Sequence, residues 1–235
     1  MDMMKRILTV TAAAVMACGL LTGCPDKASP EHSIDDPLPT DSVNTSTMDF
    51  SQQTAQSSED AEEIGSFVVT LYPEYAPISC ENFENLVKEG FYDGLYFHRV
   101  VDGFMAQGGD PALAGKEGVQ TITGEFSENG WTQNTLSHTR GVVSMARSND
   151  MNSASSQFFI CYSDKYTSSL DGKYAAFGKV TEGMEVVDKF LTVERLANAK
   201  GETAVPNVPI TIKKAEMIEP DAEGKHRARF DMTIG

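Results

Sequence analysis

Residues 97–110 (FHRVVDGFMAQGGD) constrain the fold of this chain more than any other stretch. Their apolar residues indicate two short strands, separated by an Asp-Gly pair and ended by a Gly-Gly pair. Arg99 therefore lies on a strand, beside large apolar side chains. Residues 141–160 (GVVSMARSNDMNSASSQFFI) have the same character, with a strand, a polar loop and a second strand. Together the two blocks predict an apolar pocket with polar edges.

The remaining periodicity predicts short strands and two helices. Strands are predicted over residues 64–72, 95–101, 103–108, 119–123, 142–145, 157–162, 175–180 and 208–218. Helical spacing is found over residues 77–89, with Ser79 as the N-cap and Gly90 as the stop, and again over residues 183–192. Many short strands with turn signals and only two helices favour a closed antiparallel barrel.

The first 24 residues are similar to a bacterial lipoprotein signal. Lys5-Arg6 supply the positive region, residues 7–21 are apolar, and Leu-Thr-Gly-Cys24 closes the segment as a lipobox. Cleavage there would leave an N-terminal Cys24 that carries acyl chains and anchors the protein to the membrane. The alternatives are an ordinary secretory signal peptide and a transmembrane anchor, for which the apolar run is short.

Composition divides the rest of the chain into three parts. Residues 25–63 hold ten acidic residues against Lys27 alone, and we expect a disordered acidic tether. Such a tether is repelled by anionic lipid and nucleic acid; it is either a spacer or solubilising filler. Residues 64–219 are expected to form one domain, and residues 220–235 a polar C-terminal tail.

Cysteine and histidine usage predicts neither a metal nor a cofactor. Cys80 and Cys161 are the two cysteines of the predicted domain; they permit one disulfide or two buried thiols. We favour the thiols, because Cys161 continues the apolar run Phe-Phe-Ile. The four histidines are scattered and lack metal-ligand spacing.

Three blocks resemble the signatures of cyclophilin-type peptidyl-prolyl cis-trans isomerases: FHRVVDGFMAQGGDP, GVVSMARSNDMNSASSQFFIC and LDGKYAAFGKV. Upstream, FVVTLYPEYAPISCENFENLVKEGFYDGLYFHRV continues the resemblance in register, so that it covers about residues 64–219. It implies a mainly β fold: a closed eight-stranded antiparallel β-barrel, capped by two α-helices, with the site on the outer wall.

The resemblance also implies roles for individual residues. Arg99 matches the catalytic arginine, and Phe104 and Gln107 belong with it. The residues that match substrate-binding positions are Met105, Ala146, Arg147, Gln157, Phe159, Leu170 and Tyr174. Taken alone, Arg99 is more typical of a salt bridge, and the apolar residues of a core. We interpret His98 and His138 as structural.

Two positions depart from the family pattern. Ser169 stands where eukaryotic members usually carry a tryptophan, in a loop that is longer by about one residue, and Tyr174 replaces a histidine. The tryptophan indole donates a hydrogen bond to cyclosporin in the family. We therefore expect weakened cyclosporin binding.

The sequence predicts an isomerase that is lipid-anchored to the bacterial cell membrane on its extracytoplasmic side. Its partners would be proline-containing polypeptides and the membrane, through the N-terminal lipid, and not nucleic acid; we expect a monomer. One alternative is a binding module that grips proline-containing segments without turnover. Another is a structural envelope protein, which would not need a polar-edged apolar pocket.

Overall fold

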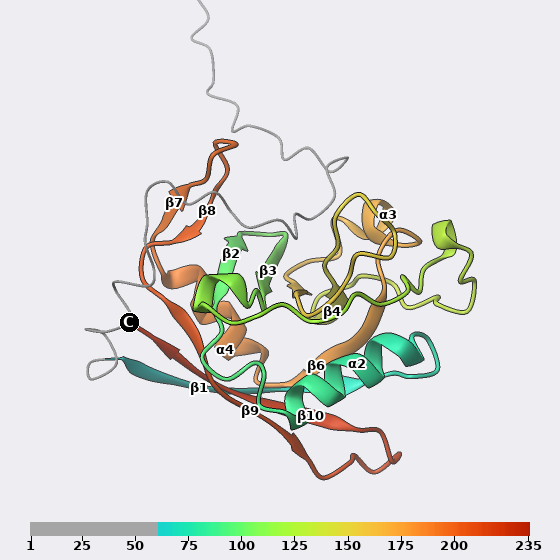
Figure 1. Ribbon diagram of the computed structural model, residues 1–235. Coiled ribbons are helices and arrows are strands. Elements are labelled where there is room, and N and C mark those ends of the chain that lie inside the picture. The colour runs from blue at the N-terminus through green and yellow to red at the C-terminus, as the bar shows by residue number, and fades with distance from the viewer. Residues whose placement is uncertain (1–60) are drawn as a thin grey trace, which may run out of the picture. The chain divides into compact units, whose positions relative to one another are not determined.

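The computed structural model describes residues 61–235 (Figure 1). The strands are β1 (Glu62–Leu71), β2 (Phe97–Val101), β3 (Met105–Gly108), β4 (Val142–Met145), β5 (Phe158–Cys161), β6 (Ala176–Glu182), β7 (Arg195–Ala197), β8 (Thr203–Pro206), β9 (Ile210–Ile218) and β10 (Arg227–Ile234). The helices are α2 (Pro77–Lys88), α3 (Thr167–Leu170) and α4 (Met184–Lys189), with 3-10 turns η1 (Ala112–Ala114), η2 (Ser127–Asn129) and η3 (Phe190–Thr192). The predicted signal, Cys24 and all but the last residues of the predicted tether lie outside the described residues.

Eight strands form one antiparallel sheet in the order β2-β3-β5-β4-β6-β1-β10-β9. Its two outer strands approach each other, because Tyr96, just before β2, bridges to Thr211 of β9. The Ile212 amide also donates to the Leu95 carbonyl at 2.8 Å. The sheet is thus a nearly closed barrel, and the mainly β prediction is confirmed. Within residues 61–235, no helix combines the length and apolarity that a membrane span requires.

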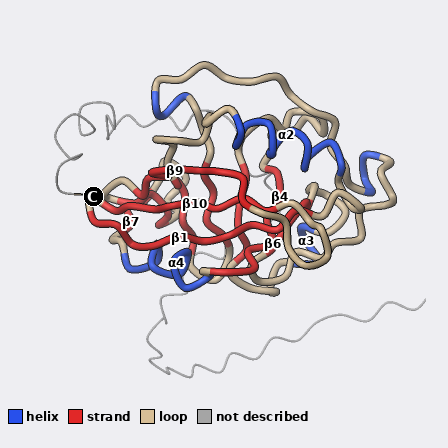
Figure 2. Tube along the Cα trace, turned by 90° about the horizontal axis from the view of Figure 1, so that it is seen from below, coloured by secondary structure: helices blue, strands red, loops and turns tan. Residues whose placement is uncertain are grey.

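The prediction of a polar tail is wrong for most of residues 220–235. Arg227–Ile234 form β10, which pairs with β1 on one side and β9 on the other (Figure 2). Ala228, Phe230 and Met232 are buried, and polar residues alternate with them. This alternation with a period of two is a strand signal, which the overall polarity of the segment concealed.

The predicted strand over residues 119–123 is also wrong. Ile122 makes one isolated bridge to Ala154, and no strand forms around it. The sheet therefore has the expected eight strands, but β10 takes the place of this segment. The hairpin of β7 and β8, for which no element was predicted, lies beside β2 in Figure 1.

Helix α2 occupies the predicted range, but its N-cap is not the predicted Ser79 and its N-terminus is satisfied differently. Ala76 is the N-cap and Pro77 follows it in the first turn, so Ser79 lies inside the helix. The fully buried carboxylate of Glu125 accepts from the amides of Ile78 and Ser79 at 2.9 and 2.7 Å. A carboxylate at this position satisfies free N–H groups and complements the helix dipole. The stop at Gly90, with φ +65°, is confirmed.

The barrel interior is filled by aromatic side chains. Phe83 of α2 contacts Tyr92, Phe158, Phe177 and Phe230, with ring centroids 4.9–5.8 Å apart. Cys80, one turn before Phe83, donates from its thiol to the Phe177 carbonyl at 3.2 Å. Both described cysteines are free and buried, and burial raises the pKa of Cys80 to about 12. The preference for two thiols over a disulfide agrees with this arrangement.

His98 lies on β2 next to Arg99 and is buried. Burial, reinforced by the Arg99 charge, lowers the pKa of His98 to about 4. Its Nδ1 atom has no hydrogen-bond partner among residues 61–235. The imidazole is therefore neutral in the folded domain at neutral pH.

We predict that the last strand is required for folding. Removal of residues 220–235 deletes β10, which leaves β9 without its neighbour in the sheet and β1 paired with β6 alone. Loss of one core phenylalanine alone costs about 3–5 kcal/mol, and whole domains are stable by about 5–15 kcal/mol. The truncated protein should lose its cooperative unfolding transition in urea, followed by circular dichroism. Removal of Gly235 alone is the control, and an unchanged midpoint after the longer truncation would contradict the prediction.

We also predict that His98 makes the domain less stable in acid. Between pH 6.5 and 4 the unfolded histidine binds a proton that the folded one does not, so the free energy of unfolding falls as pH falls. The shift corresponds to about 3 kcal/mol. Urea titrations at pH 7 and pH 4.5 should show a smaller difference for His98→Phe than for the native protein. Equal differences in the two proteins would show that His98 does not contribute.

Candidate active site

A second apolar cluster is separate from the barrel core. It contains Phe104, Met105, Ala146, Phe159, Cys161, Tyr166, Leu170 and Tyr174, with Val101 packed against it. Six of its members are residues that the sequence analysis assigned to the site: Phe104, Met105, Ala146, Phe159, Leu170 and Tyr174. The structure therefore brings together residues that are far apart in the chain.

Strand register brings the polar residues to the same cluster. Arg99 of β2 is paired with Gln107 of β3, and Gln107 is paired with Phe159 of β5. Directly paired residues project to the same side of a sheet. The three side chains therefore form a row across neighbouring strands, on the face away from the barrel core.

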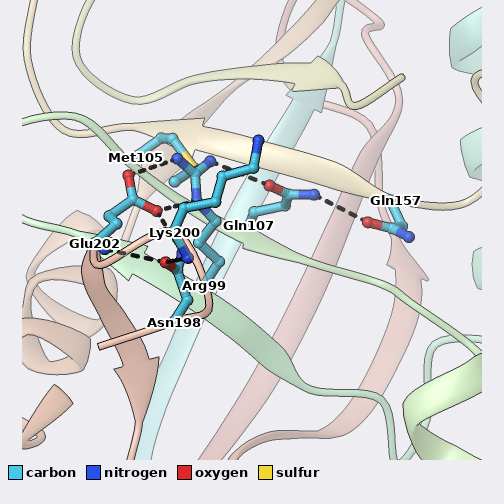
Figure 3. Close-up of polar contacts among 7 residues, drawn as sticks. All are labelled: Arg99, Met105, Gln107, Gln157, Asn198, Lys200 and Glu202. Atoms are coloured by element: carbon cyan, nitrogen blue, oxygen red, sulfur yellow. Dashed lines mark hydrogen bonds and ion pairs between the residues drawn. The ribbon is translucent and has the colours of Figure 1, made fainter. Parts of the chain in front are cut away.

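Arg99 lies at one end of this row (Figure 3). Its Nη1 atom is 3.5 Å from Oε1 of Gln107 and 3.8 Å from the sulfur of Met105. The centre of the guanidinium is 5.7 Å from the centroid of the Phe104 ring. Arginine stays protonated and has only donors, so the row ends in a permanent cation beside apolar side chains.

The same guanidinium also forms an ion pair. Nε and Nη2 of Arg99 donate to the two carboxylate oxygens of Glu202, each at 2.8 Å. From the sequence, Arg99 was predicted either to form a salt bridge or to act in catalysis. In the structure the ion pair leaves Nη1 directed at the cluster. Glu202 was not among the predicted site residues. A partner 103 positions away has no local sequence signal.

Two amides form the next part of the row. Nε2 of Gln107 donates to Oε1 of Gln157 at 2.9 Å (Figure 3). The Gln157 carbonyl accepts from the amide of Ala146, also at 2.9 Å. Gln107 and Gln157 thus link Arg99 to the backbone beside Ala146. Both glutamines are among the predicted site residues, and the structure places them next to each other.

Tyr166 is a member of the cluster that the sequence analysis missed. Its ring lies 4.5 Å from that of Phe104, measured between centroids. In this segment only Ser169 was discussed from the sequence. Ser169 is partly exposed and is not part of the cluster. An aromatic residue within a run of small polar residues was the available signal.

Arg147 uses its side chain differently from the other predicted residues. Its guanidinium lies 5.0 Å from the ring centroid of Phe126 and 4.9 Å from that of Tyr174. Its Nε donates to the Lys173 carbonyl at 2.9 Å. The side chain therefore supports the Tyr174 edge of the cluster.

His138 lies in a hydrogen-bonded chain behind Phe159. Its Nδ1 is 2.7 Å from Asp171, its Nε2 is 2.9 Å from the hydroxyl of Ser144, and its ring stacks on Phe159. Burial raises the pKa of Asp171, but bonds from His138 and Ser137 outweigh it and lower the pKa below the ordinary value. Ser144 is itself fully buried. The interpretation of His138 as structural agrees with these contacts.

Comparison with known proteins identifies the family to which this chain is similar. The family profile described as cyclophilin type peptidyl-prolyl cis-trans isomerase/CLD matches residues 56–217. A peptidyl-prolyl cis-trans isomerase of Acinetobacter baylyi is 41% identical over 154 residues, covering 63% of this chain and 78% of the relative. Peptidyl-prolyl cis-trans isomerase ppi1 of Schizosaccharomyces pombe is 43% identical over 124 residues, covering 52% and 77%.

A solved structure agrees with these sequence matches. A cyclophilin type peptidyl-prolyl cis-trans isomerase of Cryptosporidium parvum superimposes with a TM-score of 0.50 and 26% identity, covering 72% of this chain and 98% of that chain. The family profile covers more than half of the chain, and the relatives at about 40% identity carry one activity in their names. This chain belongs to the cyclophilin-type peptidyl-prolyl cis-trans isomerase family.

Proposed function

We propose that this isomerase accelerates rotation of X-Pro bonds in extracytoplasmic proteins, with Arg99 as its catalytic residue, and so assists their folding. The observation that carries the role of Arg99 is its position, with Nη1 beside Met105 and Gln107 at the edge of the second apolar cluster. A permanent donor beside an apolar surface suits a reaction that needs no proton transfer.

The chemistry follows from the amide bond. Resonance opposes rotation with a barrier of roughly 18–20 kcal/mol. In the twisted state the prolyl nitrogen regains its lone pair and can accept a hydrogen bond. Nη1 of Arg99 donates to that nitrogen and therefore binds the twisted state more tightly than either planar state. The guanidinium keeps all its protons throughout.

The other residues hold the substrate. Phe104, Met105, Phe159 and Leu170 form the apolar surface for the proline ring. Gln107, Gln157 and the main chain at Ala146 and Arg147 bond the substrate backbone, with Tyr174 at the edge. These assignments are supported by the membership of the second apolar cluster and by the row of amides that begins at Arg99.

One hydrogen bond is not enough for large acceleration. A factor of about 10⁴ in rate requires about 5.5 kcal/mol of differential binding. A hydrogen bond to a charged group contributes about 1.5–3 kcal/mol. The remainder must come from exclusion of water by the apolar surface, where a charge acts through a lower dielectric.

The proposed location is the extracytoplasmic side of a bacterial membrane. The lipobox that ends in Cys24 and the acidic segment that follows it support this part of the proposal. Acyl chains on Cys24 would hold the protein at the membrane. The acidic segment would extend by self-repulsion and let the domain reach polypeptides that emerge nearby.

We predict that Arg99→Ala lowers kcat/KM for an X-Pro peptide by 100-fold or more, mainly through kcat. The interaction is strongest in the transition state, and a 100-fold loss corresponds to about 2.7 kcal/mol. Turnover and thermal unfolding should be measured on the same preparation, in a protease-coupled assay. Arg140→Ala is the matched control, because Arg140 forms an exposed ion pair with Asp188. Near-normal turnover of folded Arg99→Ala would exclude the proposed role.

A contrasting loss is expected for Phe104→Ala. This change removes apolar contact with the proline ring, so it should raise KM as well as lower kcat. It also removes the packing of Phe104 against Tyr166 and should lower the unfolding temperature. A Phe104→Ala protein with unchanged KM would place the proline ring elsewhere.

The anchor is tested separately from the chemistry. Cys24→Ser should abolish incorporation of labelled fatty acid, because serine lacks the thiol that is acylated. Isomerase activity of the purified protein should remain unchanged. If Cys24→Ser still takes up label, the lipid is attached at another residue.

A further inference from the structure

The hairpin of β7 and β8 brings an acidic residue to the catalytic arginine. Glu202 lies in the turn between the two strands, just before β8, and meets Arg99 of β2 (Figure 3). The side chains of Arg99 and Glu202 are only 10% and 18% exposed. This ion pair is therefore shielded from water, unlike the exposed pair of Arg140 and Asp188.

The contact has the planar geometry of a paired fork. The two oxygens of Glu202 accept from Nε and Nη2 of Arg99, each at 2.8 Å. Two parallel bonds fix the plane of the guanidinium as well as its position. Without this pair, the long side chain of Arg99 would sample many rotamers. The carboxylate thus removes the rotational freedom of the group that must meet the substrate.

The turn between β7 and β8 also holds the carboxylate of Glu202 in place. Nδ2 of Asn198 donates to Oε2 of Glu202 at 3.1 Å, and Oδ1 of Asn198 accepts from the Glu202 amide at 3.0 Å. Gly201 completes the turn with φ +81°, where a side chain would be strained. Glu202 is therefore fixed at its main chain and at its carboxylate.

The pairing decides which edge of Arg99 is presented. Glu202 occupies Nε and Nη2, and Nη1 lies against Met105 and Gln107. Nη1 is thus the nitrogen on the side of the second apolar cluster. We propose that Glu202 is a positioning residue, which holds the guanidinium of Arg99 so that Nη1 points at the prolyl nitrogen. This inference rests on the role proposed for Arg99.

A carboxylate beside Arg99 also has an effect that opposes catalysis. A negative charge beside Arg99 lowers the positive potential that the prolyl nitrogen meets. Directed donation dominates, because a hydrogen bond weakens steeply when its angle departs from linearity. A misplacement of about 1 Å is able to cost 100-fold in rate. A neutral residue at position 202 therefore tests whether the orientation of Arg99 or the potential at the prolyl nitrogen has the larger effect on the rate.

The experiment compares Glu202 variants of the full chain in the X-Pro peptide assay. Glu202→Ala should lower kcat/KM by about 10- to 100-fold, with KM little changed. Glu202→Gln has one acceptor oxygen and should lose less kcat/KM than Glu202→Ala. Glu202→Asp should likewise be more active than Glu202→Ala. Glu194→Ala is the matched control, since Glu194 lies just before β7 and accepts from Asn207 instead of Arg99; its activity should be unchanged.

A spectroscopic readout distinguishes positioning from general loss of structure. The Nε–H proton of Arg99 should give a sharp, slowly exchanging NMR signal in the native protein and in the Glu194→Ala variant. The signal should broaden in Glu202→Ala. Asn198→Ala, which keeps the charge of Glu202 but removes its support, should show a smaller loss in kcat. If Glu202→Ala unfolds, the Glu202→Gln and Asn198→Ala variants test the positioning role in its place.

Each result has a distinct meaning. Loss of activity in Arg99→Ala together with full activity in Glu202→Ala would overturn the positioning role and leave the role of Arg99 intact. Full activity in Arg99→Ala would overturn the role of Arg99 itself. Higher activity in Glu202→Gln would show that the carboxylate inhibits. In support of positioning, adding Glu202→Ala to Arg99→Ala should cause no further loss.

Discussion

Antiparallel pairing of β2, β3 and β5, with a bulge in β2 between Phe97 and Arg99, sorts side chains onto two faces. Both the barrel core and the candidate site depend on this sorting. Phe97 and Phe158 face the aromatic core, whereas Arg99, Gln107 and Phe159 form the row on the other face. A slip of one residue in any of these strands would exchange the two sets. The same backbone hydrogen bonds therefore maintain stability and the proposed catalytic geometry.

Placing the charge of Arg99 on this row costs free energy of hydration, and contacts within the fold offset that cost. A guanidinium that is removed from water loses hydration, and Glu202 compensates it through two short bonds. The hairpin of β7 and β8 supplies this carboxylate and also covers the side of Arg99. The guanidinium of Arg99, the proposed catalytic group, is thus held between an apolar surface and an acidic partner.

Strand β10 shows that family membership leaves part of the architecture open. The family profile ends at residue 217, before β10, yet this strand lies in the sheet between β1 and β9. Its buried residues, among them Phe230, contact the aromatic core around Phe83. A segment outside the matched region therefore contributes to the stability of the region that carries the site.

The sequence alone determined most strands and helix α2, because these depend on local periodicity within short segments. Phe104, Met105 and Phe159 were assigned to the site because short motifs resemble those of the family, and the structure places them in one cluster. Tertiary structure decided what depends on contacts between distant segments. Glu125 satisfies the first turn of α2, Glu202 meets Arg99, and β10 joins the sheet. Their partners are chosen by how the chain folds back on itself, and no local pattern carries that information.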